Sequence, residues 1–223
     1  MATAETVFVE IQELTGELIL TGLCIDQNFP ALKEGRDGKV SIDISGDEDR
    51  DLSVTLKNVP YQESYSILLN QRSFNLKLID GGLIQMMYQF NKTELMAHRL
   101  AFFPSPDLLE YQNNSEIYEM DELYGDIIAR NVVTSPVRFD FDRLNFVDYD
   151  HPMSHLTIGQ YKNCRIPVSG AVSPFLFINF ILRSFYNTPY QKFCADIKHR
   201  DYYFEKNITK RETSQIHIQT CII

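Results

Sequence analysis

The feature that most constrains the fold is a run of alternating apolar and polar residues over about 72–103. SFNLKLID is separated by Gly81 and Gly82 from LIQMMYQF, and a third run, ELMAHRLAFFP, follows the turn NKTE. Alternation with a period of two is typical of strands, and paired glycines between two such runs indicate a tight hairpin turn. The stretch therefore predicts an antiparallel meander.

Further strands and helices are predicted on both sides of the meander. SPVRFDFD begins another alternating run, and shorter runs continue to about residue 168. Helical spacing of apolar residues marks the N-terminal region, and Ser173 followed by Pro174 is a strong helix start. The predicted fold class is α+β: an antiparallel sheet with a meander at about 72–103 and further strands at about 135–168, packed by helices near 5–28, 60–71 and 173–199.

The chain of 223 residues has neither an internal repeat nor a low-complexity linker, which favours one α+β domain over 1–223. Residues 1–59 differ in charge, because they carry 12 acidic and 5 basic side chains. They are predicted to form an acidic appendage, a helix followed by a hairpin at 39–57. The hairpin would have a solvated acidic tip, and this N-terminal part would repel phosphate.

Composition restricts the classes of function. A formal net charge of -9 argues against a protein that coats nucleic acid through bulk electrostatics. The four cysteines are far apart and form no CxxC pair, as expected in a reducing compartment. The most apolar run, at 174–186, is too short to span a bilayer, and the N-terminus lacks a basic leader. We therefore expect a cytoplasmic protein without membrane contact.

Residues 137–167 are the most crowded in chemically active side chains. In VRFDFD, strand alternation places Arg138, Asp140 and Asp142 on one face. One interpretation is structural, with Arg138 paired to the aspartates. In the functional interpretation Arg138 binds a phosphate or the aspartates bind Mg²⁺, although no acidic partner completes a metal site.

His151 and His155 are four residues apart, but Pro152 lies between them and favours a turn over a helix. A zinc site with Cys164 is disfavoured, since the spacing matches no common zinc signature. His155 begins a predicted strand and should project at a sheet edge. There it is either a general base near neutral pH or a half-buried residue bonded to Asp150 or Ser154.

Alternation also predicts one polar row of Tyr161, Asn163 and Arg165, to which Arg99 of the meander adds a cation. Together these residues suggest a metal-independent phosphodiesterase site without a cofactor. The predicted roles are catalytic for His151, His155 and Tyr161, phosphate-binding for Arg99, Arg138 and Arg165, and supporting for Asp140, Asp142 and Asn163.

Several stretches carry a resemblance to known families: SFNLKLIDGGLIQMMYQF, HRLAFFPSP and, most specific, HPMSHLTIG with CRIPV. Over about residues 70–190 the chain resembles a family of bacterial proteins known mainly as a domain of unknown function. A weaker, motif-level similarity is to small toxins of toxin–antitoxin systems, which also have a glycine-turned hairpin, an Arg-Asp strand and a histidine pair. This similarity implies an effector that acts on RNA.

Two functional hypotheses follow. The first is a cytoplasmic bacterial defence or toxin-type effector that acts on RNA and has a protein partner, either an antitoxin or a defence-complex subunit. The alternative is a non-catalytic subunit that docks onto a larger anti-phage defence or nucleic-acid-processing complex through its acidic N-terminal part. An acidic antitoxin-like inhibitor, which rests on charge alone, ranks below both.

Overall fold

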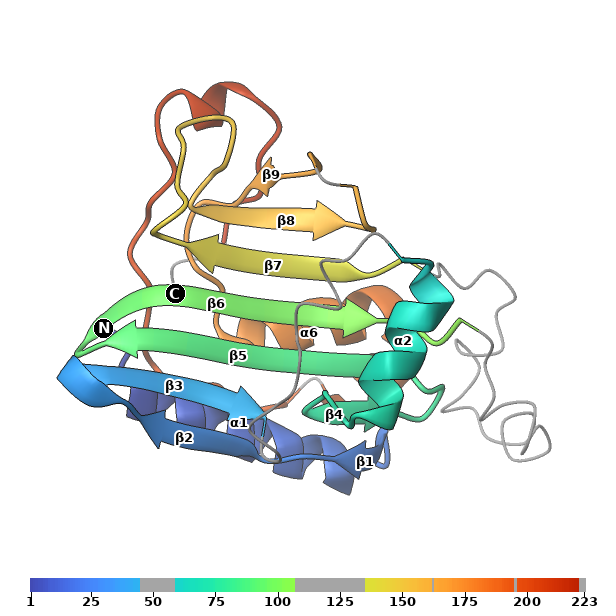
Figure 1. The fold of residues 1–223 in the computed structure, drawn as a ribbon. Coiled ribbons are helices and arrows are strands. Elements are labelled where there is room, and N and C mark those ends of the chain that lie inside the picture. Colours follow the sequence, from blue (N-terminus) through green and yellow to red (C-terminus); the bar gives the residue numbers. More distant parts are fainter. Residues whose placement is uncertain (45–58, 107–134, 162, 195, 221–223) are drawn as a thin grey trace.

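A computed structural model describes residues 1–44, 59–106, 135–161, 163–194 and 196–220 (Figure 1). The fold is α+β, as predicted, and its centre is a nine-stranded antiparallel sheet. Along the main path the order is β1-β4-β5-β6-β7-β8-β9, and β3 pairs with both β2 and β5. The strands are β1 (Cys24–Gln27), β2 (Pro30–Glu34), β3 (Lys39–Ile44), β4 (Leu76–Leu78), β5 (Leu83–Asn91), β6 (Glu94–Phe103), β7 (Val137–Asp142), β8 (Ser154–Ile158) and β9 (Ile166–Pro167).

The predicted meander is confirmed as β4, β5 and β6. β5 and β6 pair along their whole length, from Leu83 opposite Phe103 to Asn91 opposite Glu94. In the turn between β4 and β5, Gly81 has a φ of 88°, which L side chains rarely adopt. Gly81 is therefore required by the backbone conformation of this turn.

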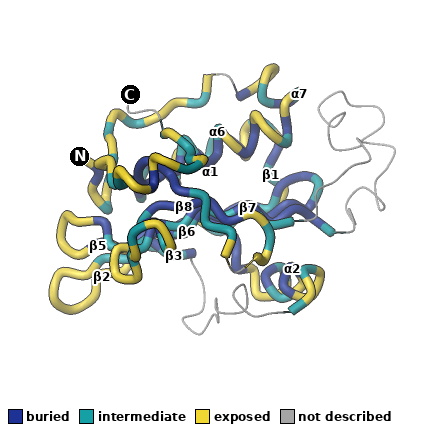
Figure 2. The backbone as a smooth tube through the Cα atoms, turned by 90° about the horizontal axis from the view of Figure 1, so that it is seen from above, coloured by how far each residue is buried: buried dark blue, intermediate teal, exposed yellow. Residues whose placement is uncertain are grey.

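Helices lie on both faces of the sheet (Figure 2). Helices α1 (Ala4–Leu20) and α6 (Pro174–Phe185) cover one face, and α2 (Tyr61–Asn70) packs on the other. The predicted start of α6 is confirmed, since the Ser173 hydroxyl accepts a hydrogen bond from the backbone of Leu176. Within the described ranges no helix combines the length and apolar character that crossing a membrane requires.

Two helix boundaries differ from the prediction. The first helix ends at Leu20 rather than near 28, because Gly22, with a φ of 75°, turns the chain into β1. The helix α6 ends at Phe185, and the short α7 (Asn187–Pro189) and a π-helical turn at Tyr190–Cys194 follow it directly. Within the region near 173–199 that was predicted to be helical, residues 174–185 and 187–194 are helical, and residues 196–199 are not.

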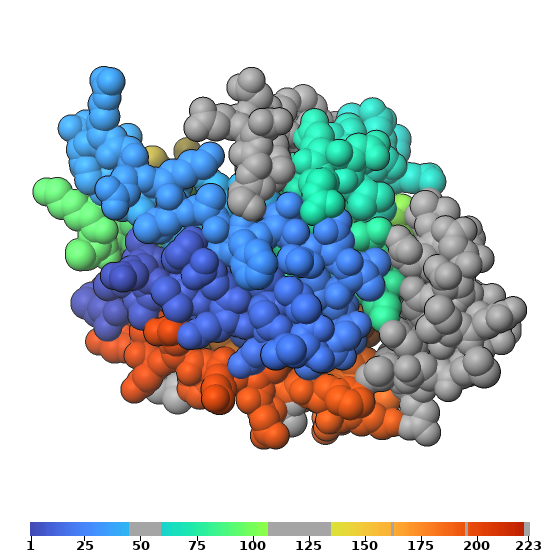
Figure 3. Space-filling view, turned by 90° about the horizontal axis from the view of Figure 1, so that it is seen from below, coloured from blue at the N-terminus to red at the C-terminus, as the bar shows by residue number. Residues whose placement is uncertain are grey.

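The acidic N-terminal part contributes β1, β2 and β3 to the sheet. The first half of its predicted hairpin at 39–57 is β3, which pairs with β2 and β5. The second half of this hairpin and most of its acidic tip lie outside the described residues. In a space-filling view residues 1–44 lie directly against the C-terminal part of the chain (Figure 3). The buried Glu10 joins the two, because its carboxylate accepts hydrogen bonds from the backbone of Arg200 and the hydroxyl of Tyr202.

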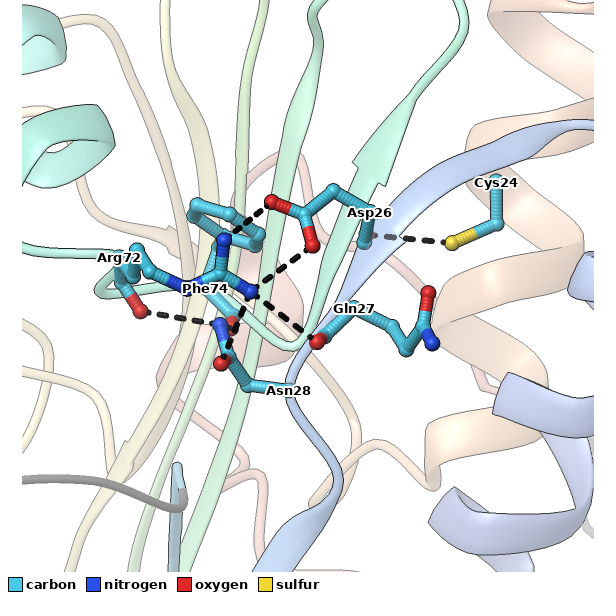
Figure 4. Close-up of polar contacts among 6 residues, drawn as sticks. All are labelled: Cys24, Asp26, Gln27, Asn28, Arg72 and Phe74. Atoms are coloured by element: carbon cyan, nitrogen blue, oxygen red, sulfur yellow. Dashed lines mark hydrogen bonds and ion pairs between the residues drawn. The ribbon is translucent and has the colours of Figure 1, made fainter.

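A polar clasp connects β1 to the segment between α2 and β4 (Figure 4). The guanidinium of Arg72 donates two hydrogen bonds to the carboxylate of Asp26, at 2.6 and 2.8 Å. The Asn28 amide donates to the carbonyls of Arg72 and Phe74. These contacts hold the β1 edge against the sheet. In the strand order, β1 lies on the opposite side of β5 from β6, β7 and β8.

Candidate functional site

A groove of about 980 Å³ lies on the face of the sheet that carries α2. Its floor is formed by side chains of β5, β6, β7 and β8 that point away from α1 and α6. The helix α2 covers only one end of this face, where Tyr65 and Leu68 pack against Phe103. Eight of the nine predicted site residues line the groove: Arg99, Arg138, Asp140, Asp142, His151, His155, Tyr161 and Arg165.

Strand register brings three of these residues into one row. Arg99 on β6 lies opposite Asp140 on β7, and Asp140 lies opposite His155 on β8. Because side chains alternate along a strand, residues directly opposite one another project from the same face of the sheet. The row crosses the middle of the groove.

Asp140 is the centre of an ion-pair network. Its carboxylate lies 2.5 Å from Nε of Arg138, 3.6 Å from Nε of Arg99 and 3.8 Å from Nε2 of His155. The structural interpretation of Arg138 is therefore correct as far as Asp140 is concerned. Burial lowers the pKa of Arg99, and the charge of Asp140 opposes that shift.

His155 is buried, with 3% of its surface exposed, and does not lie at the sheet edge. The prediction was wrong because the short strand β9 pairs beyond β8 and places Pro167 opposite His155. Its Nδ1 lies 2.9 Å from the carbonyl oxygen of Pro152, instead of bonding to Asp150 or Ser154. That bond requires a proton on Nδ1, so the lone pair of the neutral ring is on Nε2, toward Asp140.

Two opposing effects act on the pKa of His155. Burial, the larger effect, lowers this pKa, and the carboxylate of Asp140 raises it. The net direction is down, so the ring is neutral near pH 7. Asp140 stabilises the imidazolium that would form if Nε2 accepted a proton.

His151 lies on the loop between β7 and β8, and its ring centroid is 5.1 Å from that of His155. As the intervening proline predicted, neither histidine is helical. Nδ1 of His151 contacts the carbonyl oxygen of Asn145, and Asp142 accepts hydrogen bonds from the backbone of Leu144 and Asn145. Asp142 therefore shapes the loop and does not pair with Arg138.

Tyr161, Asn163 and Arg165 do not form the predicted alternating row, because none of the three lies in a strand. Tyr161 and Arg165 still line the groove, but the exposed Asn163 does not. Within the described part of the chain, Arg165 has no hydrogen-bonding or ion-pair partner, and only Nε of Arg138 is engaged. Their remaining N–H groups are donors for an anion in the groove.

Among the described residues, no group of three or more His, Cys, Asp or Glu side chains is arranged to hold a metal ion. His151 and His155 line the groove, but Cys164 does not. The zinc arrangement with Cys164 is thus not formed in this part of the chain.

Sequence reasoning missed several groove residues. Thr157 was detectable, since it follows His155 by two residues on the same strand and so shares its face. Others come from α2, from the face of β5, from the end of β6 and from the turn after β8, and no local pattern connects them to the histidines. They include Tyr61, Ser64, Met87, Gln89, Phe103 and Gln160.

Comparison with known proteins places the chain in a family. The model of DUF2290, described as an uncharacterized conserved protein, matches residues 23–220. The chain belongs to the DUF2290 family. The match extends well beyond the predicted 70–190 and includes all nine strands of the described residues. No curated protein and no solved structure matches the chain.

Proposed function

We propose that this DUF2290 protein binds single-stranded RNA in the groove and cleaves its phosphodiester bonds without a metal ion. The observation that carries the proposal is the common location of two histidines and three arginines in one groove, with the histidine rings 5.1 Å apart. An acid, a base and cations for a phosphate are the groups that this reaction requires.

In the proposed reaction the neutral Nε2 of His155 accepts the proton of a ribose 2′-hydroxyl. The 2′-oxygen attacks the phosphorus, and the bond from phosphorus to the 5′-oxygen breaks. His151, protonated and held through Nδ1 by the Asn145 carbonyl, gives its Nε2 proton to the leaving oxygen. The products are a 2′,3′-cyclic phosphate and a 5′-hydroxyl end.

The other predicted residues have supporting roles in this proposal. Arg138 and Arg165 hold the phosphate through N–H groups that no described residue engages, and Arg99 neutralises Asp140. Asp140 stabilises the imidazolium of His155. Tyr161 is the alternative proton donor. In a cell, such an activity suits a defence or toxin-type effector whose partner, an antitoxin or a defence-complex subunit, controls it.

The test is cleavage of a 5′-labelled RNA oligonucleotide by the purified protein in EDTA. His155→Ala and His151→Ala should each lower the rate by about 10²- to 10⁴-fold, the usual contribution of general acid–base catalysis. His199→Ala is the matched control, because His199 is exposed and lies outside the groove. An oligonucleotide of 2′-deoxyribose should not be cut. Cleavage of this DNA control, or full activity of both groove variants, would contradict the mechanism.

Two observations favour the non-catalytic alternative. His155 is only 3% exposed, and a carboxylate between two arginines is also a common structural network. A docking subunit would show no cleavage by the wild type, and His155→Ala would change only its stability. Urea denaturation of each variant, run beside the cleavage assay, separates loss of activity from loss of the fold.

A further inference from the structure

The groove is longer than the histidine–arginine site needs. Along β6 toward α2, the row formed by Arg99 and Asp140 is followed by the row that contains Arg138. Phe103 then forms the end of the groove floor. Phe103 lies four residues beyond Arg99 on β6, which corresponds to about 13 Å at the usual rise of a strand. The part of the groove next to α2 therefore has room for a group attached to a phosphate held at Arg138.

The lining of this α2 end differs in character from the rest. It consists of Tyr61, Ser64, Phe103, Pro136, Gly159, Gln160 and Tyr161. None of these side chains carries a charge at neutral pH, whereas the remaining lining contains three arginines, three aspartates and the histidines. A flat, uncharged ligand group suits this lining better than a second phosphate.

Tyr161 is the most distinctive residue there. Its side chain borders the groove, yet 76% of its surface is exposed, and no ring of the described residues stacks on it. Gly159 determines how close the ring comes to the backbone, since a Cβ at Gly159 would lie 3.3 Å from a ring carbon of Tyr161. The tyrosine thus presents an open aromatic face beside a glycine in the groove.

Polar groups border this face. The Gln160 side-chain amide donates to the Ser64 hydroxyl at 3.4 Å, a long hydrogen bond that a ligand can replace. The hydroxyl of Tyr61, in contrast, is engaged by the carbonyl of Pro104, which fixes that ring as part of the wall. An aromatic face with an adjacent amide is the usual arrangement for recognising an unstacked base.

We propose that the α2 end of the groove is a nucleobase subsite, in which a base stacks on Tyr161 while its phosphate is bound at Arg138. This inference rests on the proposed function, because it uses the same phosphate site. It specifies a single-stranded ligand with a splayed base. The groove lining contains three aspartates and three arginines. This balance of charge agrees with a single-stranded ligand, because the backbone of a long duplex requires a strongly cationic surface.

The experiment is calorimetric titration of the purified protein with adenosine 5′-monophosphate and with ribose 5-phosphate, which lacks the base. Stacking is worth about 1–3 kcal/mol per base, so the nucleotide should bind about 5- to 150-fold more tightly. Tyr161→Leu should remove this difference, and Tyr161→Phe should keep it. Arg183→Gln is the control, because Arg183 is a cation on α6 outside the groove. This substitution should change neither affinity.

The outcomes separate the two proposals. Equal affinity for the two ligands, or a nucleotide preference that survives in Tyr161→Leu, would overturn the base subsite and leave the phosphate site standing. If neither ligand binds, the phosphate site is refuted, and the base subsite fails with it. Tighter binding of the nucleotide without any RNA cleavage would retain the subsite as part of a binding protein and refute the nuclease.

Discussion

His98 should make the protein sensitive to acid, and replacing it by glutamine should remove that sensitivity. His98 is adjacent to Arg99 on β6 but points to the opposite face, into the core, where it is 4% exposed. Its Nε2 accepts a hydrogen bond from the backbone of Val172 at 3.1 Å, and its ring packs against those of Tyr88 and Phe141. Burial lowers the pKa of His98 to about 4.

The sign and size of the effect follow from this pKa. The unfolded chain binds the proton near the ordinary value of 6.5, whereas the folded chain binds it only near 4. The stability contributed by neutral His98 is therefore complete above pH 6.5 and is lost as the pH falls toward 4. This difference between the pKa values of the unfolded and the folded chain corresponds to about 3 kcal/mol of unfolding free energy.

The assay is urea denaturation of the wild type and His98→Gln at a series of pH values from 7 to 4. The glutamine side-chain oxygen can accept the hydrogen bond from Val172 but does not titrate. Burial also raises the pKa values of Glu10 and Asp80, but these groups are present in both proteins and their effects cancel in the difference. The wild type should lose about 3 kcal/mol more than the variant. Parallel curves would refute a neutral, buried His98.

Other substitutions test the fold and the loop that carries His151. Gly82→Ala should destabilise the protein by about 1–3 kcal/mol in urea denaturation, because the added Cβ would lie 2.9 Å from a ring carbon of Phe102. Gly16→Ala should instead stabilise helix α1 by about 0.5–1 kcal/mol, because a Cβ at that position would have no atom within 4 Å. Asp26→Asn removes an exposed ion pair and should cost at most about 1 kcal/mol, less in high salt. Glu212→Ala should cost about 1–3 kcal/mol and speed amide hydrogen exchange in residues 143–151, since this buried carboxylate accepts hydrogen bonds from that loop and from its own segment.

Sequence reasoning succeeded where a pattern is local. Two-residue alternation located β5, β6 and β7, and Ser173 with Pro174 located the start of α6. It failed where the outcome depends on a distant partner. Nothing local to His155 indicates that β9 will pair beyond β8 and bury it, because β9 is a strand of two residues whose partner only the tertiary structure supplies.

The composition of the site was predictable, but its geometry was not. Crowding of residue types over 137–167 identified seven of the residues that line the groove, and Arg99 was added from its unusual place in an apolar strand. The pairing of Arg99 with Asp140 depends on the register between β6 and β7. A slip of one residue would place His98 or Leu100 opposite Asp140 and turn the arginine toward the core. Side-chain alternation within each strand carries no information about that register.

The same register also explains why two histidines are needed in the proposed reaction. Placing His155 opposite Asp140 in the sheet gives it a carboxylate that stabilises its imidazolium, but it also buries the ring and lowers its pKa. A buried neutral imidazole is suited to accept a proton and unsuited to retain one for the leaving group. His151, on the loop shaped by Asp142, is half-buried and borders the same groove. In the proposed reaction the sheet therefore favours His155 as the base, and His151 on the loop is better placed than His155 to be the acid.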